Sequence, residues 1–357
     1  MANLMDYVDW RKDLDFKADP FNIVDNLLFS ECTYIDFEEV MEDGNTITEV
    51  AQAYFQKHSE KEIQKRKTFY HLAPFLLPKM AHSKRFGKIV LSDYVNIVDK
   101  NMQISAITFV CDDFIYIAYR GTDDTLVGWK EDFDFSYKQE TPGQREALRY
   151  CQRIAQKYPQ KIYIGGHSKG GNFAYYVAMH ASKAIQERLV QVYSNDGPGF
   201  IRRVWQEVDP SILNKMVKIS PCNCTIGALL ENPVQPIYCL SNQMGLMQHD
   251  CLSWQILGKQ FVTGQQDAKS LWFENTIRQW VVDVDFVHRQ QFVETIFGIF
   301  QQAGVYCLED FSGHQIQILK AINDLPKEES QLVQSLLRKL LGSSKKVLVD
   351  QVKRITN

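Results

Sequence analysis

One serine in this sequence stands among glycines, in the run Gly-Gly-His-Ser-Lys-Gly-Gly at residues 165–171. The mostly apolar segment 161–164 before it is typical of a strand, and the segment from about 170 has a helical pattern. A serine in a tight turn between a strand and a helix projects its Oγ above the sheet, and the helix N-terminus stabilises a developing oxyanion. Small neighbours are needed because such a turn is strained and closely packed. We therefore predict that Ser168 is the nucleophile of an acyl-transfer reaction.

Two other interpretations of these glycines are a turn that only packs and a loop that binds phosphate. In a P-loop the lysine comes before the serine or threonine, whereas here Ser168 precedes Lys169. The order of the residues therefore favours the nucleophile.

A second oxyanion donor must come from the end of an earlier strand, because the turn itself supplies only the backbone N–H of the residue after the serine, Lys169. Residues 114–119 are apolar throughout, which is typical of a strand buried on both faces, and Arg-Gly-Thr follows at 120–122. We expect the second donor in this segment. An ordinary turn at the end of a strand is the alternative.

These motifs together resemble those of a known family. An apolar strand ending in Arg-Gly-Thr, Trp129 and Asp132 shortly after it, and then Gly-His-Ser-x-Gly-Gly are similar to the class 3 lipases, the fungal triacylglycerol lipase type, and their bacterial relatives. The resemblance covers roughly residues 100–255. It implies an α/β-hydrolase fold and the hydrolysis of carboxylic esters.

The resemblance also implies roles for individual residues. Thr122 gives its backbone N–H and its hydroxyl to the oxyanion, while Trp129 and Asp132 stabilise the loop after the strand. The position after the nucleophile is usually apolar in this family, but here it is Lys169. We expect this cation beside the nucleophile to make the acyl pocket less than purely apolar.

The general base should follow the nucleophile, because the order along the chain in this fold is Ser, acid, His. Four of the eight histidines do so, namely those at 180, 249, 288 and 314. Three of the four lie in segments with a helical pattern, whereas His249 follows the strand-like residues 236–240 through a loop. A loop after the last strand is where this fold places its base. We therefore predict that His249 is the general base.

The acid is harder to place. In class 3 lipases it follows a later strand, but the corresponding segment here, 218–225, contains no carboxylate. Asp196, in Ser-Asn-Asp-Gly-Pro, ends the preceding strand, and Asp250 adjoins His249. Neighbours on a chain rarely point at each other, so we predict Asp196. Turn formation, which Asn-Asp-Gly-Pro favours by itself, is its alternative role.

The elements that position these residues alternate between strand and helix over residues 86–265, which predicts an α/β-hydrolase core. We expect a mostly parallel central sheet with helices on both faces. Residues 1–85 are predicted to be an N-terminal helical extension packed on the core, and residues 266–357 a C-terminal helical region. Residues 123–145 can form a lid or rim over the site.

The composition supports a folded protein that works without nucleic acid. Hydrophobic residues make up 45% and charged residues 23% of 357, and the net charge is −3. Eight cysteines without a secretory signal favour free thiols and a cytoplasmic location. The pair Cys222 and Cys224 has poor spacing for zinc, so we expect no metal and no cofactor. The basic segment 345–355 either packs on the domain or lies on an anionic membrane surface.

The sequence thus predicts a serine hydrolase that cleaves a small-molecule or lipid ester through an acyl-enzyme. A thioesterase or acyltransferase would use the same residues. A hydrolase-fold scaffold that binds partners without catalysis is the alternative from another class, and the missing family acid favours it. The oligomeric state is left open.

Overall fold

The computed structural model describes residues 1–66, 68, 70–307, 310–311, 313–331 and 333–335. A seven-stranded sheet lies at its centre, and its strands are adjacent in the order in which they occur along the chain. The first three strands pair antiparallel, and β3 to β7 are all parallel. The strands are β1 Val90–Val98, β2 Gln103–Val110, β3 Phe114–Tyr119, β4 Lys161–His167, β5 Leu189–Asn195, β6 Met216–Pro221 and β7 Pro236–Cys239. The predicted fold class, an α/β hydrolase with a mostly parallel sheet, is confirmed.

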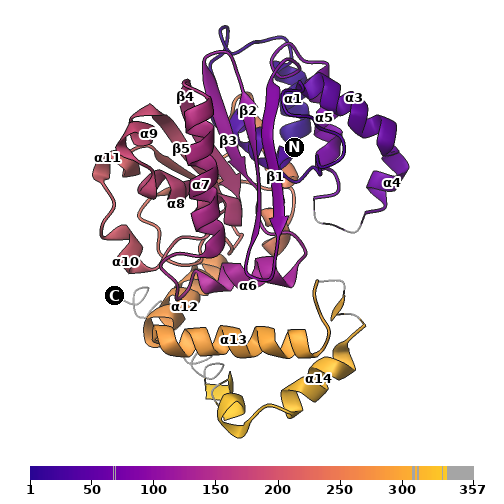
Figure 1. Ribbon diagram of the computed structural model, residues 1–357. Coiled ribbons are helices and arrows are strands. Elements are labelled where there is room, and N and C mark those ends of the chain that lie inside the picture. The colour runs from indigo at the N-terminus through magenta and orange to yellow at the C-terminus, as the bar shows by residue number, and fades with distance from the viewer. Residues whose placement is uncertain (67, 69, 308–309, 312, 332, 336–357) are drawn as a thin grey trace.

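Helices cover both faces of the sheet, which is why β3 is apolar at every position. Alternate side chains of a strand point to opposite faces. Tyr116 and Ala118 belong to the apolar cluster on one face, and Ile115 and Ile117 to the cluster on the other. Figure 1 shows the helices near the N-terminus on one side of the strands, and α7 to α9 on the other.

The first 85 residues supply most of the layer on one face. Helix α2 lies against β3, β4 and β5, and Phe29 stacks on Phe109 of β2 with ring centres 4.3 Å apart. Buried Arg85 pairs with buried Asp25 of α2, which fixes the end of this segment to its middle. The helices are α1 Leu4–Arg11, α2 Ile23–Cys32, α3 Ile47–Lys57, α4 Glu60–Gln64 and α5 Leu76–Ala81. The chain boundaries at residues 85 and 265 remain predictions.

The opposite face is covered mainly by two long helices. Helix α7 begins at Pro142 after Thr141, whose hydroxyl accepts a hydrogen bond from the backbone N–H of Gln144. It buries a stripe that includes Ala147 and Ile154. Helix α8 lies beside it, against β4 and β5. The helices that follow β3, β4 and β5 are α6 Leu126–Asp134, α7 Pro142–Lys157, α8 Lys169–His180, α9 Lys183–Arg188, α10 Arg202–Trp205 and α11 Pro210–Leu213.

The C-terminal helices α12 Ala268–Asp283, α13 Phe286–Gln302 and α14 Gln315–Asn323 lie beyond the end of the sheet at which α6 is found (Figure 1). Phe297 of α13 packs on Phe133 of α6, with ring centres 5.6 Å apart. The basic segment 345–355 lies outside the described residues. Among the residues that are described, no helix has both the length and the apolar character needed to cross a membrane.

Candidate active site

Ser168 lies between the end of β4 and the start of α8, as the sequence predicts for a nucleophile elbow. Its backbone angles are φ 56° and ψ −129°, a strained conformation for a residue with a side chain. The end of strand β3 passes so close that a Cβ on Gly170 would lie 2.0 Å from the carbonyl oxygen of Tyr119. A Cβ on Gly166 would lie 2.4 Å from the carbonyl carbon of Gly170. Only glycine fits at these two positions.

His249 and Asp196 are brought together by the ends of two strands. Asp196 directly follows β5, and His249 ends a short 3₁₀ helix, Gly245–His249, after β7. Nδ1 of His249 donates a hydrogen bond of 2.7 Å to Oδ2 of Asp196, whose side chain is fully buried. Oδ1 of Asp196 accepts a 3.1 Å hydrogen bond from the backbone N–H of Gly227. Asp250, the other candidate acid, accepts instead from the backbone N–H of Leu252, at 2.9 Å.

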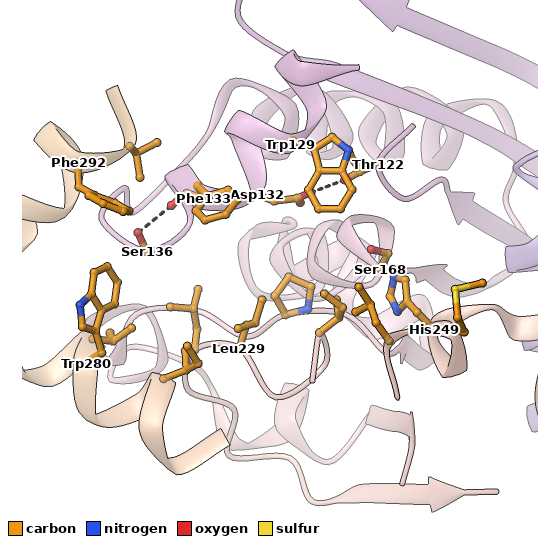
Figure 2. A pocket seen from close by; sticks show the side chains of 18 of the residues that line it. Thr122, Trp129, Asp132, Phe133, Ser136, Ser168, Leu229, His249, Trp280 and Phe292 are labelled. Carbon is orange, nitrogen blue, oxygen red and sulfur yellow. Dashed lines mark hydrogen bonds between the residues drawn. The ribbon is translucent and has the colours of Figure 1, made fainter. Parts of the chain in front are cut away.

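Ser168, His249 and Thr122 line one pocket, and Figure 2 shows Ser168 and His249 next to each other at one end of it. Thr122, Ser168 and Asp196 follow the carboxyl ends of β3, β4 and β5, where ligand sites of parallel α/β sheets lie. A serine, an imidazole and a carboxylate in this arrangement can carry out nucleophilic acyl transfer.

The hydroxyl of Thr122 donates a hydrogen bond to Oδ2 of Asp132, one helical turn beyond Trp129 on α6 (Figure 2). Burial raises the pKa of Asp132 to about 6, although this hydrogen bond and the charge of Lys169 act in the opposite direction. The hydroxyl is therefore engaged with Asp132, and the backbone N–H of Thr122 remains for the oxyanion role that the resemblance implies.

The pocket itself is an apolar cavity of about 370 Å³. Its walls come mainly from α6, from the segments after β6 and β7, and from helices α12 and α13. Trp280 and Phe292 lie at the end opposite Ser168 in Figure 2. The apolar and aromatic lining residues are Tyr70, Trp129, Phe133, Pro198, Ile226, Leu229, Leu230, Leu246, Met247, Ile277, Trp280, Val281, Phe292 and Val293.

The side chain of Lys169 does not line this pocket, so the expectation that it makes the pocket less apolar is wrong. Its side chain leaves the first turn of α8 toward α6, where Nζ lies 3.3 Å from Oε2 of Glu131, and both side chains are buried. Nζ also lies 3.5 Å from the backbone carbonyl oxygen of Gly128. Lys169 is not one of the residues that line the cavity. Its predicted contribution, a backbone N–H at the elbow, does not depend on the side chain.

A second histidine, which was not predicted from the sequence, lies against the candidate base. The ring of buried His167 is 4.3 Å, centre to centre, from the ring of His249. Its Nδ1 lies 2.7 Å from the hydroxyl of Tyr34, which stacks on Tyr70. Burial lowers the pKa of His167 well below its usual value, so this ring is neutral. Its place directly before Ser168 was the one available signal.

The C-terminal helices also contribute to the site, which no motif indicated. Trp280 comes from α12, Phe292 from α13, and both are more than a hundred residues beyond Ser168. Among the described residues, one group of side chains has the composition and proximity for a metal: Asp196, Cys224 and His249, with ligand atoms all within 4.8 Å of one another. Cys222, considered with Cys224 from the sequence, is not part of it.

The Mbeg1-like family profile matches residues 80–298, more than half of the chain. Among solved structures, one match is the crystal structure of Lip2 lipase from Yarrowia lipolytica, with a TM-score of 0.28 and 15% sequence identity. The match covers 39% of this chain and 60% of the lipase, so the chain spans less than two thirds of that protein's length. A search of curated proteins finds no significant match.

Proposed function

This chain belongs to the Mbeg1-like family, a lipase-like family, and from that premise we propose that it is a serine hydrolase that cleaves carboxylic esters. The observation that carries the proposal is the 2.7 Å hydrogen bond from His249 Nδ1 to buried Asp196, at the same pocket as Ser168. A carboxylate on Nδ1 leaves Nε2 without a proton, which is the form that can act as a base.

In the proposed reaction Nε2 of His249 takes the proton of Ser168 as Oγ attacks the ester carbonyl. The backbone N–H groups of Thr122 and Lys169 stabilise the oxyanion. The imidazolium then gives its proton to the leaving alcohol, and the acyl group stays on Ser168. Water, activated by the same imidazole, attacks the acyl-enzyme and releases the acid.

The apolar cavity supports an ester whose acyl or alcohol part is a hydrocarbon chain, in a small molecule or a lipid. The same residues can release an acyl group from a thioester or pass it to an alcohol acceptor. Comparing the hydrolysis of matched p-nitrophenyl esters and acyl thioesters, with and without added alcohol, distinguishes these activities.

The proposal is tested with a fluorophosphonate probe, which labels an activated serine. We expect the wild-type protein to be labelled and Ser168→Ala to remain unlabelled. Ser194→Ala is the matched control, because Ser194 is a buried serine on the neighbouring strand β5 and should leave the label in place. An unlabelled wild-type protein would favour the non-catalytic scaffold.

The acid is tested separately. Asp196→Asn should lower the turnover of a p-nitrophenyl ester by about 10³- to 10⁴-fold, because the amide no longer holds the imidazole in the basic tautomer. Asp250→Asn serves as the control and should change turnover far less. If Asp250→Asn lowers turnover strongly and Asp196→Asn does not, the acid is Asp250.

A further inference from the structure

Three side chains with metal-binding atoms converge beside the candidate base from three separate segments. Asp196 follows β5, Cys224 follows β6, and His249 follows β7. Sγ of Cys224 lies 3.9 Å from Nδ1 of His249, which lies 2.7 Å from Oδ2 of Asp196. A thiolate, an imidazole and a carboxylate are the ligand types that zinc takes in proteins. We propose that these residues form an inhibitory zinc site. In this site zinc binds Nδ1 of His249, the nitrogen whose hydrogen bond to Asp196 orients the imidazole.

The three ligand atoms lie within 4.8 Å of one another, so a tetrahedral ion requires them to shift by about 1 Å or less. Zinc bonds of about 2.0–2.3 Å place neighbouring ligand atoms roughly 3.3–3.8 Å apart. The present distance of 3.9 Å from Cys224 Sγ to His249 Nδ1 is close to this range. The contact from His249 to Asp196 must open by roughly 0.6–0.8 Å, which a small rotation of the imidazole supplies. Because His249 lines the pocket, water from the pocket can fill the fourth position.

Zinc binding changes the protonation of His249 and Cys224. Zinc takes Nδ1 of His249, so the single proton of the neutral ring moves through solvent to Nε2. The thiol of Cys224 loses its proton to solvent, and Asp196 binds as the carboxylate that it already is when it accepts from His249. One proton is released for each zinc bound. An imidazole that carries its proton on Nε2 is a donor there, so it cannot accept the proton of Ser168.

The surroundings favour reversible rather than permanent binding. Cys224 is buried, so zinc has to lose most of its hydration water to reach Sγ. The buried ammonium of Lys218, hydrogen-bonded to the carbonyl of Gly227, lies near Asp196 and opposes a second cation. A site with three protein ligands and these costs should release zinc to a chelator, unlike a four-ligand structural site.

Zinc binding is independent of the proposed esterase activity, whereas inhibition rests on it, so the two are measured separately. Chelator-treated full-length protein is titrated with zinc in competition with a chromophoric zinc indicator. We expect one zinc per chain in the wild type and at least tenfold weaker binding in Cys224→Ala. Cys222→Ala is the matched control, a buried cysteine two residues away that should bind like the wild type. Equal affinity in Cys224→Ala and the wild type, or no binding by the wild type, overturns the proposal.

Inhibition is then measured with a p-nitrophenyl ester. One equivalent of zinc should lower the wild-type rate at least tenfold, and EDTA should restore it. Cys224→Ala should keep its own metal-free rate under the same zinc concentration. A wild-type rate that stays unchanged with one zinc bound overturns the inhibitory role.

Ser168→Ala separates failure of this inference from failure of the proposed function. It should turn over no ester yet bind zinc like the wild type. If the wild type hydrolyses no ester but loses zinc affinity on Cys224→Ala, the zinc site stands and the proposed function fails. If it hydrolyses ester and binds no zinc, the function stands and the site fails.

Discussion

The ammonium group of Lys169 lies 3.3 Å from Oε2 of Glu131, and this ion pair joins the first residue of α8 to α6. Oε1 of Glu131 accepts a further hydrogen bond of 2.7 Å from the backbone N–H of Gly143, at the start of α7. The pair therefore connects the helix behind the nucleophile to the two helices that precede it in the chain. The cation that the sequence led us to expect beside the acyl pocket instead joins α8 to α6.

Removing one partner of this buried pair should destabilise the protein strongly. Lys169→Met leaves the carboxylate of Glu131 buried without its cation, so the free energy of unfolding should fall by about 3–5 kcal/mol. The double variant Lys169→Met/Glu131→Gln should recover part of that loss, because no unpaired charge remains. Urea unfolding measures both. A Lys169→Met variant as stable as the wild type would contradict the structural role.

The exposed pair between Arg202 and Glu231, with nitrogen and oxygen 2.9 Å apart, is the control for this prediction. Water already solvates both charges there, so Arg202→Gln should leave the unfolding free energy nearly unchanged. A similar loss in both variants would show that the effect at Lys169 is not one of burial.

The sequence predicted the sheet and the candidate nucleophile because both depend on local patterns. An unbroken apolar run specifies β3, and glycines at fixed positions around Ser168 specify a tight turn. The proximity of Asp196 to His249 could also be inferred, because consecutive parallel strands deliver their following loops to the same edge of the sheet. The roles of these residues remain predictions.

What the sequence did not predict depends on contacts between distant segments. The direction of the Lys169 side chain is set by Glu131, which precedes it by 38 residues and carries no motif. Helix α13 packs on α6, and Trp280 of α12 packs on Phe292 of α13, which a single helical pattern does not reveal. Cys224 meets Asp196 and His249 only because three loops converge, so its spacing from Cys222 was misleading.

Gly227 should be irreplaceable because it touches the candidate acid. A Cβ at this position would lie 2.2 Å from Oδ1 of Asp196 and 2.6 Å from Oγ of Ser220. Gly227→Ala should therefore displace the carboxylate from His249 and lower kcat at least about tenfold in an ester assay. Gly298→Ala in α13 is the control, since a Cβ there meets nothing within 4 Å. That variant should keep its activity and gain up to about 1 kcal/mol in stability. Wild-type turnover in Gly227→Ala would argue against the role of Asp196.

Asp132 should make stability depend on pH in a direction opposite to that of a salt-bridged carboxylate. Burial raises its pKa from 3.8 to about 6, so the fold favours the protonated form. The resulting stabilisation is complete below about pH 4 and is lost as the pH rises through 6. Asp132→Asn is neutral throughout. Its unfolding free energy relative to the wild type should therefore increase by up to about 3 kcal/mol between pH 4 and pH 7. Urea unfolding across this interval measures the difference, and a constant difference would contradict the raised pKa.

The far end of the pocket should determine how long a hydrocarbon chain the enzyme accepts. The rings of Trp280 and Phe292 meet edge to face with centres 6.0 Å apart, at the end opposite Ser168 (Figure 2). Trp280→Ala should open this end of the pocket. Each further methylene that the enlarged pocket admits contributes roughly tenfold or more to the preference for long over short esters. We therefore expect the ratio of kcat/KM for long against short p-nitrophenyl esters to rise at least about tenfold. Leu271→Ala, on α12 but 41% exposed and outside the pocket lining, should leave the ratio unchanged. If Trp280→Ala lowers kcat/KM equally for every chain length, α12 stabilises the pocket without selecting the length of the substrate.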